Sequence, residues 1–174
     1  MKIATNLAAN LAAMKELFAK CEDIVFREFE AAEGQGRLFL VYVDNMIATT
    51  SIEDAILTNI MNRCAIQEAQ ERLEGLMENV IANRDMKRVY SIEEAAEGVM
   101  VGDTLIFMDG SPFALQASTR AYPNRGVSEV KTEVVVQGPK DAFTELLAFN
   151  LVLIRRRIRD TRLKVERAQA GKRG

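Results

Sequence analysis

Apolar residues near the start of the sequence recur with the period of an α-helix. Leu7, Leu11, Met14 and Phe18 are separated by four, three and four positions, so they share one side of a helix over 6–20. The positions between them are mostly alanine or polar. The pattern therefore predicts an amphipathic helix whose apolar side packs on a core.

Three more segments have helical periodicity, over 51–62, 64–83 and 91–101. Two of them begin with a serine that is followed three residues later by a carboxylate, a pattern that satisfies free N–H groups at a helix start. These pairs are Ser51 with Asp54 and Ser91 with Glu94. Gly102 follows the third segment, where we expect that helix to end.

A last helix is predicted over 143–159, apolar around much of its circumference before it becomes strongly basic. Phe143, Leu147 and Ile154 are four and seven positions apart, which places them on one face. We expect these three side chains to anchor the helix in the core. On that basis Phe143→Ala would cost about 3–5 kcal/mol.

Runs rich in β-branched and aromatic residues predict strands over 24–29, 38–43, 104–108, 113–117 and 132–137. Gly34 and Gly36 separate the first two runs, and Gly110 separates the next two, so both pairs have a residue that tolerates the positive φ of a reversal. Each pair is expected to form a hairpin. Together the elements predict an α/β fold of the mixed α+β kind, in which amphipathic helices pack on a mixed β-sheet with two hairpins.

The composition excludes several kinds of catalytic site. The chain has no histidine and two cysteines, Cys21 and Cys64, so it has no set of ligands for a structural zinc and no Ser-His-Asp or Cys-His nucleophile. Its glycines, Gly98 among them, form neither a dinucleotide fingerprint nor a phosphate loop and are assigned to turns and caps. We therefore expect no catalytic residue, no metal and no cofactor.

The sequence also predicts the compartment in which the protein is found. The N-terminal region lacks a secretory signal, and the longest apolar run, over 146–154, is interrupted by Asn150. That run is far shorter than the roughly 18 apolar residues that span a bilayer. We expect an intracellular domain with both thiols reduced.

Charge is distributed unevenly along the chain. Residues 155–174 hold nine of the 23 basic and two of the 25 acidic residues, a net charge of +7 against −9 for the remainder. Arg155, Arg156, Arg157 and Arg159 are either a solvated helix end, favoured by the helix dipole, or a surface for anionic lipid, an acidic subunit or nucleic acid. Nucleic acid is the weakest of these, because no aromatic residues are interleaved with the arginines.

The same C-terminal region carries a family resemblance. Gly138, Pro139, Phe143, Glu145 and Asn150 stand at the spacings of a motif in which a Gly-Pro turn enters a helix, and Leu-Ile-Arg-Arg-Arg-Ile-Arg-Asp follows over 153–160. The chain resembles the GerA spore-germination family, and the segment over 122–126 is more similar to the branch that contains the stage V sporulation protein AF. The resemblance implies that the five motif residues have structural roles.

The resemblance also implies a function. It indicates a non-catalytic domain on the cytosolic face of the spore inner membrane, which mediates subunit assembly and regulates ion release during germination. Residues 1–160 would be the first subdomain of a two-subdomain N-terminal region, and residues 161–174 a basic segment leading to the second subdomain and the membrane.

The expected partners are other germination-protein subunits or copies of the same protein, and anionic lipid headgroups, but not nucleic acid. A different class of function stays open, in which the domain binds a small molecule as the sensor of a germinant receptor A subunit.

Overall fold

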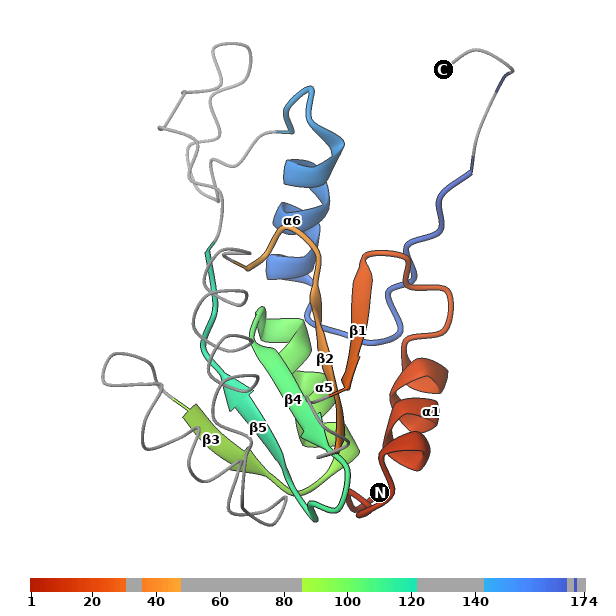
Figure 1. The fold of residues 1–174 in the computed structure, drawn as a ribbon. Helices are drawn as coiled ribbons and strands as arrows, with labels where there is room; N and C mark the ends of the chain where they lie inside the picture. Colours follow the sequence, from red (N-terminus) through yellow and green to blue (C-terminus); the bar gives the residue numbers. More distant parts are fainter. Residues whose placement is uncertain (31–35, 48–85, 122–142, 169–170, 172–174) are drawn as a thin grey trace.

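The computed structural model describes residues 1–30, 36–47, 86–121, 143–168 and 171, in which helices pack on a five-stranded sheet (Figure 1). In spatial order the strands are β1 (Ile24–Glu30), β2 (Arg37–Val43), β4 (Thr104–Met108), β5 (Ala114–Ala117) and β3 (Met86–Val89). The expected α/β class and both hairpins, β1–β2 and β4–β5, are confirmed.

The sheet differs from the expected mixed one in the direction of its strands. All four pairings between the described strands are antiparallel. Short turns account for this in the two hairpins, since a parallel neighbour needs a long crossover, whereas β2 with β4 and β3 with β5 are antiparallel pairs between strands that are distant in the sequence. The sequence pattern predicted neither the strand Met86–Val89 nor its pairing with β5, since Lys87 and Arg88 leave it without an apolar run.

The two central strands are apolar on both faces. In β2, Phe39, Val41 and Val43 belong to one core cluster, and the alternate residues Leu38 and Leu40 belong to a second. Strand β4 alternates in the same way, and Phe107 stacks on Phe39 with ring centroids 4.5 Å apart and planes 11° apart. Because side chains alternate across a strand, a wholly apolar strand must be covered on both sides.

Helices α1 (Leu7–Leu17) and α5 (Ile92–Val101) cover one face of the sheet (Figure 1). Both match the expected segments. The side chain of Ser91 accepts a hydrogen bond from the N–H of Glu94, and Gly102 ends α5 in the left-handed conformation with φ 95°. The capping serine and the terminating glycine were therefore predicted correctly.

Gly98 has a different role from the turn or cap that was expected. It lies inside α5, where a glycine is unfavourable for the helix. A Cβ atom at this position would lie 2.8 Å from the side-chain Cδ of Gln116 on β5, closer than such atoms can approach. A residue with a Cβ atom at this position would displace the Gln116 side chain, which donates to Asp103, so the close packing of the helix on the sheet favours glycine.

The first and last helices begin with the same arrangement. The Asn10 side chain accepts from the N–H of Ala4 at 2.9 Å and donates to its carbonyl at 2.7 Å. In α6 (Leu147–Arg157), Asn150 makes the same two bonds to Thr144, at 2.7 and 2.8 Å. Each asparagine is the fourth residue of its helix and binds a backbone unit six residues earlier, so each fixes the path by which the chain enters the helix.

The three expected core anchors of the last helix are not its buried residues. Phe143 precedes the helix and is 69% exposed, Leu147 is 67% exposed, and Ile154 is half-buried. The buried positions are Val152 and Arg155. The helix turns a different face to the core than the apolar spacing predicted, because an arginine occupies one of the inward positions.

Several expectations fall outside the described residues. These are the helices over 51–62 and 64–83, the strand over 132–137, the turn at Gly138 and Pro139, and Cys64. Cys21 is a buried free cysteine.

The burial of the two phenylalanines predicts opposite responses to truncation. Phe107→Ala should lower the free energy of unfolding by about 3–5 kcal/mol, because it removes a fully buried ring and leaves a cavity. Phe143→Ala, matched in chemistry but exposed, should change it by less than about 1 kcal/mol. Urea unfolding of both variants tests this, and equal losses would contradict the placement of Phe143 outside the core.

Candidate functional site

A buried ion pair joins the last helix to the beginning of the sheet. The Nε of Arg155 donates to Oδ2 of Asp23 at 2.6 Å, and Nη2 donates to Oδ1 at 2.8 Å. Both side chains are almost fully buried, 1% and 4% exposed. The fork of the guanidinium thus meets both carboxylate oxygens, the geometry in which arginine binds a carboxylate most strongly.

The third arm of the guanidinium binds a later part of the chain. Nη1 of Arg155 donates to the carbonyl oxygen of Leu163 at 3.0 Å and lies 3.7 Å from the sulfur of Met100. Arg155 therefore connects α6 with the turn before β1 and with the segment that follows α6. All three nitrogens of the guanidinium have a partner.

Asp23 is positioned by the turn that leads into β1. The N–H of Ile24 donates to the carbonyl of Cys21 at 3.1 Å, which closes the turn, and the N–H of Asp44 donates to the carbonyl of Asp23 at 2.8 Å. The first bond shapes the turn, and the second ties it to the end of β2. The carboxylate is held where α6 passes.

Electrostatics favours the charged pair over separated partners. Burial by itself lowers the pKa of Arg155, but hydrogen bonds from the guanidinium to Asp23 and the negative charge of that carboxylate outweigh burial, and the pKa is raised. A buried charge is costly unless it is paired and hydrogen-bonded. The guanidinium is therefore committed to Asp23 and is not available as an acid, a base or a free anion site.

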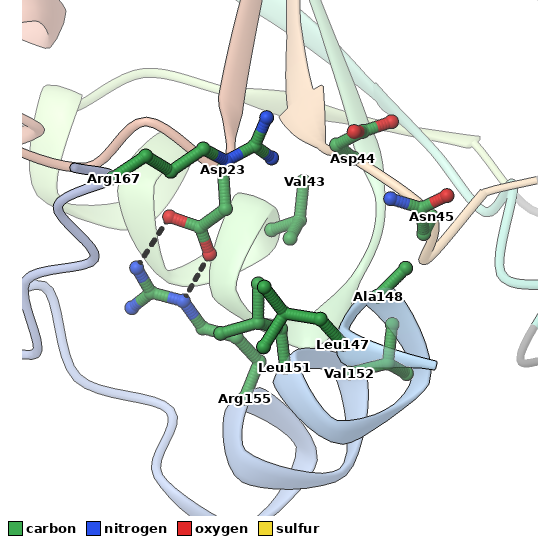
Figure 2. A pocket seen from close by; sticks show the side chains of 10 residues that line it. All are labelled: Asp23, Val43, Asp44, Asn45, Leu147, Ala148, Leu151, Val152, Arg155 and Arg167. Carbon is green, nitrogen blue, oxygen red and sulfur yellow. Dashed lines mark hydrogen bonds and ion pairs between the residues drawn. The ribbon is translucent and has the colours of Figure 1, made fainter. Parts of the chain in front are cut away.

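A cavity of about 370 Å³ lies beside this pair (Figure 2). One wall is the side of α6 on which successive turns of the helix place Leu147, Ala148, Leu151, Val152 and Arg155. The opposite side comes from the ends of β1 and β2 and from the C-terminal segment, and consists of Asp23, Val43, Asp44, Asn45 and Arg167. The cavity combines an apolar wall with side chains of both charges.

A second polar cluster lies where β4 begins. Asp103 is buried and accepts hydrogen bonds from Nε of Arg120 at 2.6 Å and from the side-chain amide of Gln116 at 2.6 Å. The Thr104 and Thr119 hydroxyls are 2.7 Å apart beside it. These contacts join the start of β4 to β5 and to the residues after it, as a structural network.

Neither cluster gathers the ligands of a metal site. Among the described residues there is no group of three or more His, Cys, Asp or Glu side chains that could hold a metal ion. The carboxylates of Asp23 and Asp103 are each engaged by an arginine. What the arrangement provides is a rigid joint next to an accessible cavity.

The structure separates the four arginines of the expected basic surface. Arg155 was expected there and is instead buried, because Asp23 compensates its charge inside the fold. Arg156, Arg157 and Arg159 are exposed at the end of α6, and Arg159 donates to the carbonyl of Arg156 at 3.3 Å. An exposed basic surface therefore contains three of the four residues.

Three residues of the family motif, Phe143, Glu145 and Asn150, lie in the described part of the chain. Glu145 and Phe143 are exposed on the segment that enters α6, whereas Asn150 binds Thr144 as described above. Asp23 was not identified from the sequence, because a single aspartate before a strand resembles any turn residue. Only its position opposite Arg155, 132 residues away, distinguishes it.

A model of the Bacillus/Clostridium GerA spore germination protein family matches residues 12–174. The chain belongs to this family. Spore germination protein KA of Bacillus subtilis (strain 168) is 28% identical over 170 residues, covering 97% of this chain and 31% of that protein. Stage V sporulation protein AF of the same organism is 34% identical over 136 residues, covering 77% of this chain and 27% of that protein. The expected family is confirmed, and this GerA-family chain spans less than a third of the length of these relatives.

A solved structure shares the fold. The crystal structure of the N-terminal domain of the A subunit of the Bacillus megaterium spore germinant receptor GerK3 superposes with a TM-score of 0.73 at 24% identity. The match covers 94% of this chain and 59% of that one. In the part of the GerA-family chain that the structure describes, no helix has the length and apolar character needed to cross a membrane.

The buried pair predicts a large cost for removing one partner. Asp23→Ala should lower the free energy of unfolding by about 3–5 kcal/mol, because it leaves the guanidinium buried without a counter-charge. Combining Asp23→Leu with Arg155→Met should recover much of this loss, since no charge is then buried. Denaturant unfolding measures both.

Asp160→Ala is the matched control, because it removes an aspartate paired with Arg162 at the surface. It should leave the free energy of unfolding nearly unchanged. A loss for Asp160→Ala as large as that for Asp23→Ala would contradict the assignment of the stability to the buried pair.

Proposed function

We propose that this chain is a non-catalytic domain of a spore inner-membrane germination protein, on the cytosolic face, where it mediates subunit assembly and the regulation of ion release. Family membership supports a role in germination. The observation that carries the assembly role is a cluster of large apolar side chains where the chain enters α6. Phe143, Leu146 and Leu147 are 69%, 58% and 67% exposed.

Exposed apolar clusters of this kind are typical of surfaces that meet another protein. The cluster is adjacent to the cavity, because Leu147 also lines the latter. The ion pair of Arg155 with Asp23 holds α6, the helix that begins with Leu147 and follows Phe143 and Leu146. The other subunits of a germination complex, or further copies of the same protein, are the partners that we propose for it.

The family motif gives this surface its shape. Asn150 fixes the backbone of Thr144, which lies between Phe143 and the start of α6. We propose that Phe143 and Glu145 serve the interface, with Gly138 and Pro139 as the structural turn that precedes them in the motif. Residues 1–160 would form the first of two subdomains, and residues 161–174 would lead to the second and to the membrane.

The apolar cluster predicts which substitutions disrupt assembly. In the full-length protein, Phe143→Ser with Leu147→Ser should reduce co-purification of partner subunits from spore membranes at least about tenfold, as loss of interface anchors does. The unfolding transition of the 174-residue chain should stay unchanged, because both side chains are exposed. The matched control, Tyr90→Ser with Ile158→Ser, removes two other exposed apolar residues. Equal co-purification of all three proteins would refute the interface.

The exposed arginines support a second contact, with anionic lipid headgroups. Arg156, Arg157 and Arg159 lie together at the end of α6, and each basic residue near an anionic membrane contributes about 1 kcal/mol. The triple change to Gln should weaken co-sedimentation with anionic vesicles at low salt, and neither protein should bind neutral vesicles. A control with Lys15, Arg37 and Lys87 changed to Gln has the same charge. If the two variants bind anionic vesicles equally well, the net charge of the protein and not this arginine surface is responsible for vesicle binding.

The cavity supports a second candidate function, a small-molecule sensor of the kind expected in a germinant receptor A subunit. Its volume of about 370 Å³ is within the range of ligand sites, and its walls are both apolar and charged. A thermal-shift screen with amino acids, nucleosides, inositol and nucleotides tests this, because a ligand that binds the native state raises the melting temperature. A selective rise that is lost in Asp44→Ala would favour the sensor, and no rise would leave assembly as the function.

A further inference from the structure

The chain that follows α6 does not leave the fold directly. Residues 160–167, called the strap below, run back along the turn that precedes β1 (Figure 1). The N–H of Val165 donates to the carbonyl of Lys20 at 3.1 Å, and the N–H of Glu22 donates to the carbonyl of Val165 at 2.9 Å. These two backbone bonds attach the strap beside the beginning of the sheet.

The buried contact of the strap is made through a single carbonyl group. The oxygen of Leu163 accepts from Nη1 of Arg155 at 3.0 Å and from the Cys21 thiol at 3.5 Å. The strap buries little apolar surface of its own, since Leu163 and Val165 are only half-buried and its other side chains are mostly exposed. Segments with few buried contacts open locally at low free-energy cost. Docking of the strap therefore depends on a small number of polar contacts. Lys164 donates to the carbonyl of Leu17 at 3.0 Å and Glu166 pairs with Lys20, both at the surface, whereas the hydrogen bond from Arg155 is the buried charged one.

Asp23 determines where that charged donor points. The guanidinium is planar and rigid, so binding both oxygens of Asp23 with Nε and Nη2 leaves Nη1 directed at Leu163. If Asp23 did not hold the fork, the side chain of Arg155 would have other orientations available. The Asp23 carboxylate thus positions the strap through the arginine.

The strap also forms part of the walls of two cavities. Arg167 lines the cavity of about 370 Å³ beside the buried pair. Thr161, Arg162 and Lys164 line a more open one of about 560 Å³, whose other residues include Leu17 of α1 and Ile92 of α5. Movement of the strap would change both cavities together.

We propose that Arg155 and Asp23 form a latch that docks the strap, and that opening the latch frees residues 160–167 as a unit while the sheet stays folded. Arg155 is a positioning residue in this device. The latch gives the domain two states, in which the chain after α6 is either held beside the turn that precedes β1 or released. Its consequence for a membrane-attached protein, a change in the direction in which the following chain leaves, rests on the function proposed above.

Amide hydrogen exchange on the 174-residue chain tests the latch without reference to germination. The reporters are the N–H groups of Glu22 and Val165, which close the contact between strap and fold. In Asp23→Asn and in Arg155→Lys, their protection should fall at least about tenfold, toward that of an unstructured chain, because the oriented donor to Leu163 is lost. Amides of β2 and β4 exchange through global unfolding and should stay more protected than the two reporters, although the loss of stability predicted for Asp23→Ala lowers their protection as well. Arg155→Lys keeps the positive charge but not the fork, so it separates orientation from charge.

Asp160→Asn is the control, since it neutralises an aspartate that pairs with Arg162 within the strap and does not touch Arg155. It should leave the protection of Glu22 and Val165 as in the parent chain. The latch is refuted if both amides keep their protection in Asp23→Asn and Arg155→Lys, or if in these variants they exchange no faster than the amides of β2 and β4. An equal effect of Asp160→Asn would refute it as well.

Discussion

The C-terminal part of this fold depends on the buried guanidinium of Arg155. Taking such a charge out of solvent costs several kcal/mol, and only good geometry offsets that cost. Arg155 meets the requirement with two bonds to Asp23 and one to Leu163. Three segments must therefore be in place at once, which are α6, the turn before β1 and the strap. A pair of this kind specifies an arrangement more than it adds to stability.

The helix that carries Arg155 presents three different surfaces. Its inward side, with Val152 and Arg155, belongs to the core. The apolar cluster at its start is exposed, and so are the arginines at its end. The last turn of the helix is basic, which suits the negative end of its dipole. A single element thus links the rigid joint, the cavity and the two surfaces proposed for partners and for lipid.

Asparagines keep the first and last helices in register with the chain before them. A helix start leaves backbone groups without partners, and Asn10 and Asn150 each satisfy a donor and an acceptor of the entering chain. For α6 these bonds bear on the proposed function, because the residue that Asn150 binds, Thr144, directly follows the exposed Phe143. The exposed cluster is therefore held in place by hydrogen bonds within the chain.

The local elements of this protein could be predicted from the sequence, since their causes lie within a few residues of one another. Leu7 to Phe18 show the period of α1, Ser91 and Gly102 cap α5, and the apolar runs on each side of Gly36 and Gly110 form the two hairpins. The family could also be inferred from the motif before and within α6. These features depend on propensity, periodicity and turn chemistry, which a sequence contains.

Which side chains are buried, and which of them pair with one another, was determined only by the tertiary structure. Spacing alone placed Phe143 and Leu147 inside and Arg155 outside, because it assigns burial by side-chain type. Asp23 reverses that assignment from 132 positions away, and no local signal marks it. Glycine at position 98 of α5 is favoured by the side chain of Gln116, which reaches it from β5, and β3 is a strand because β5 lies beside it. In each case the energy comes from a contact between distant segments, which exists only once the chain has folded.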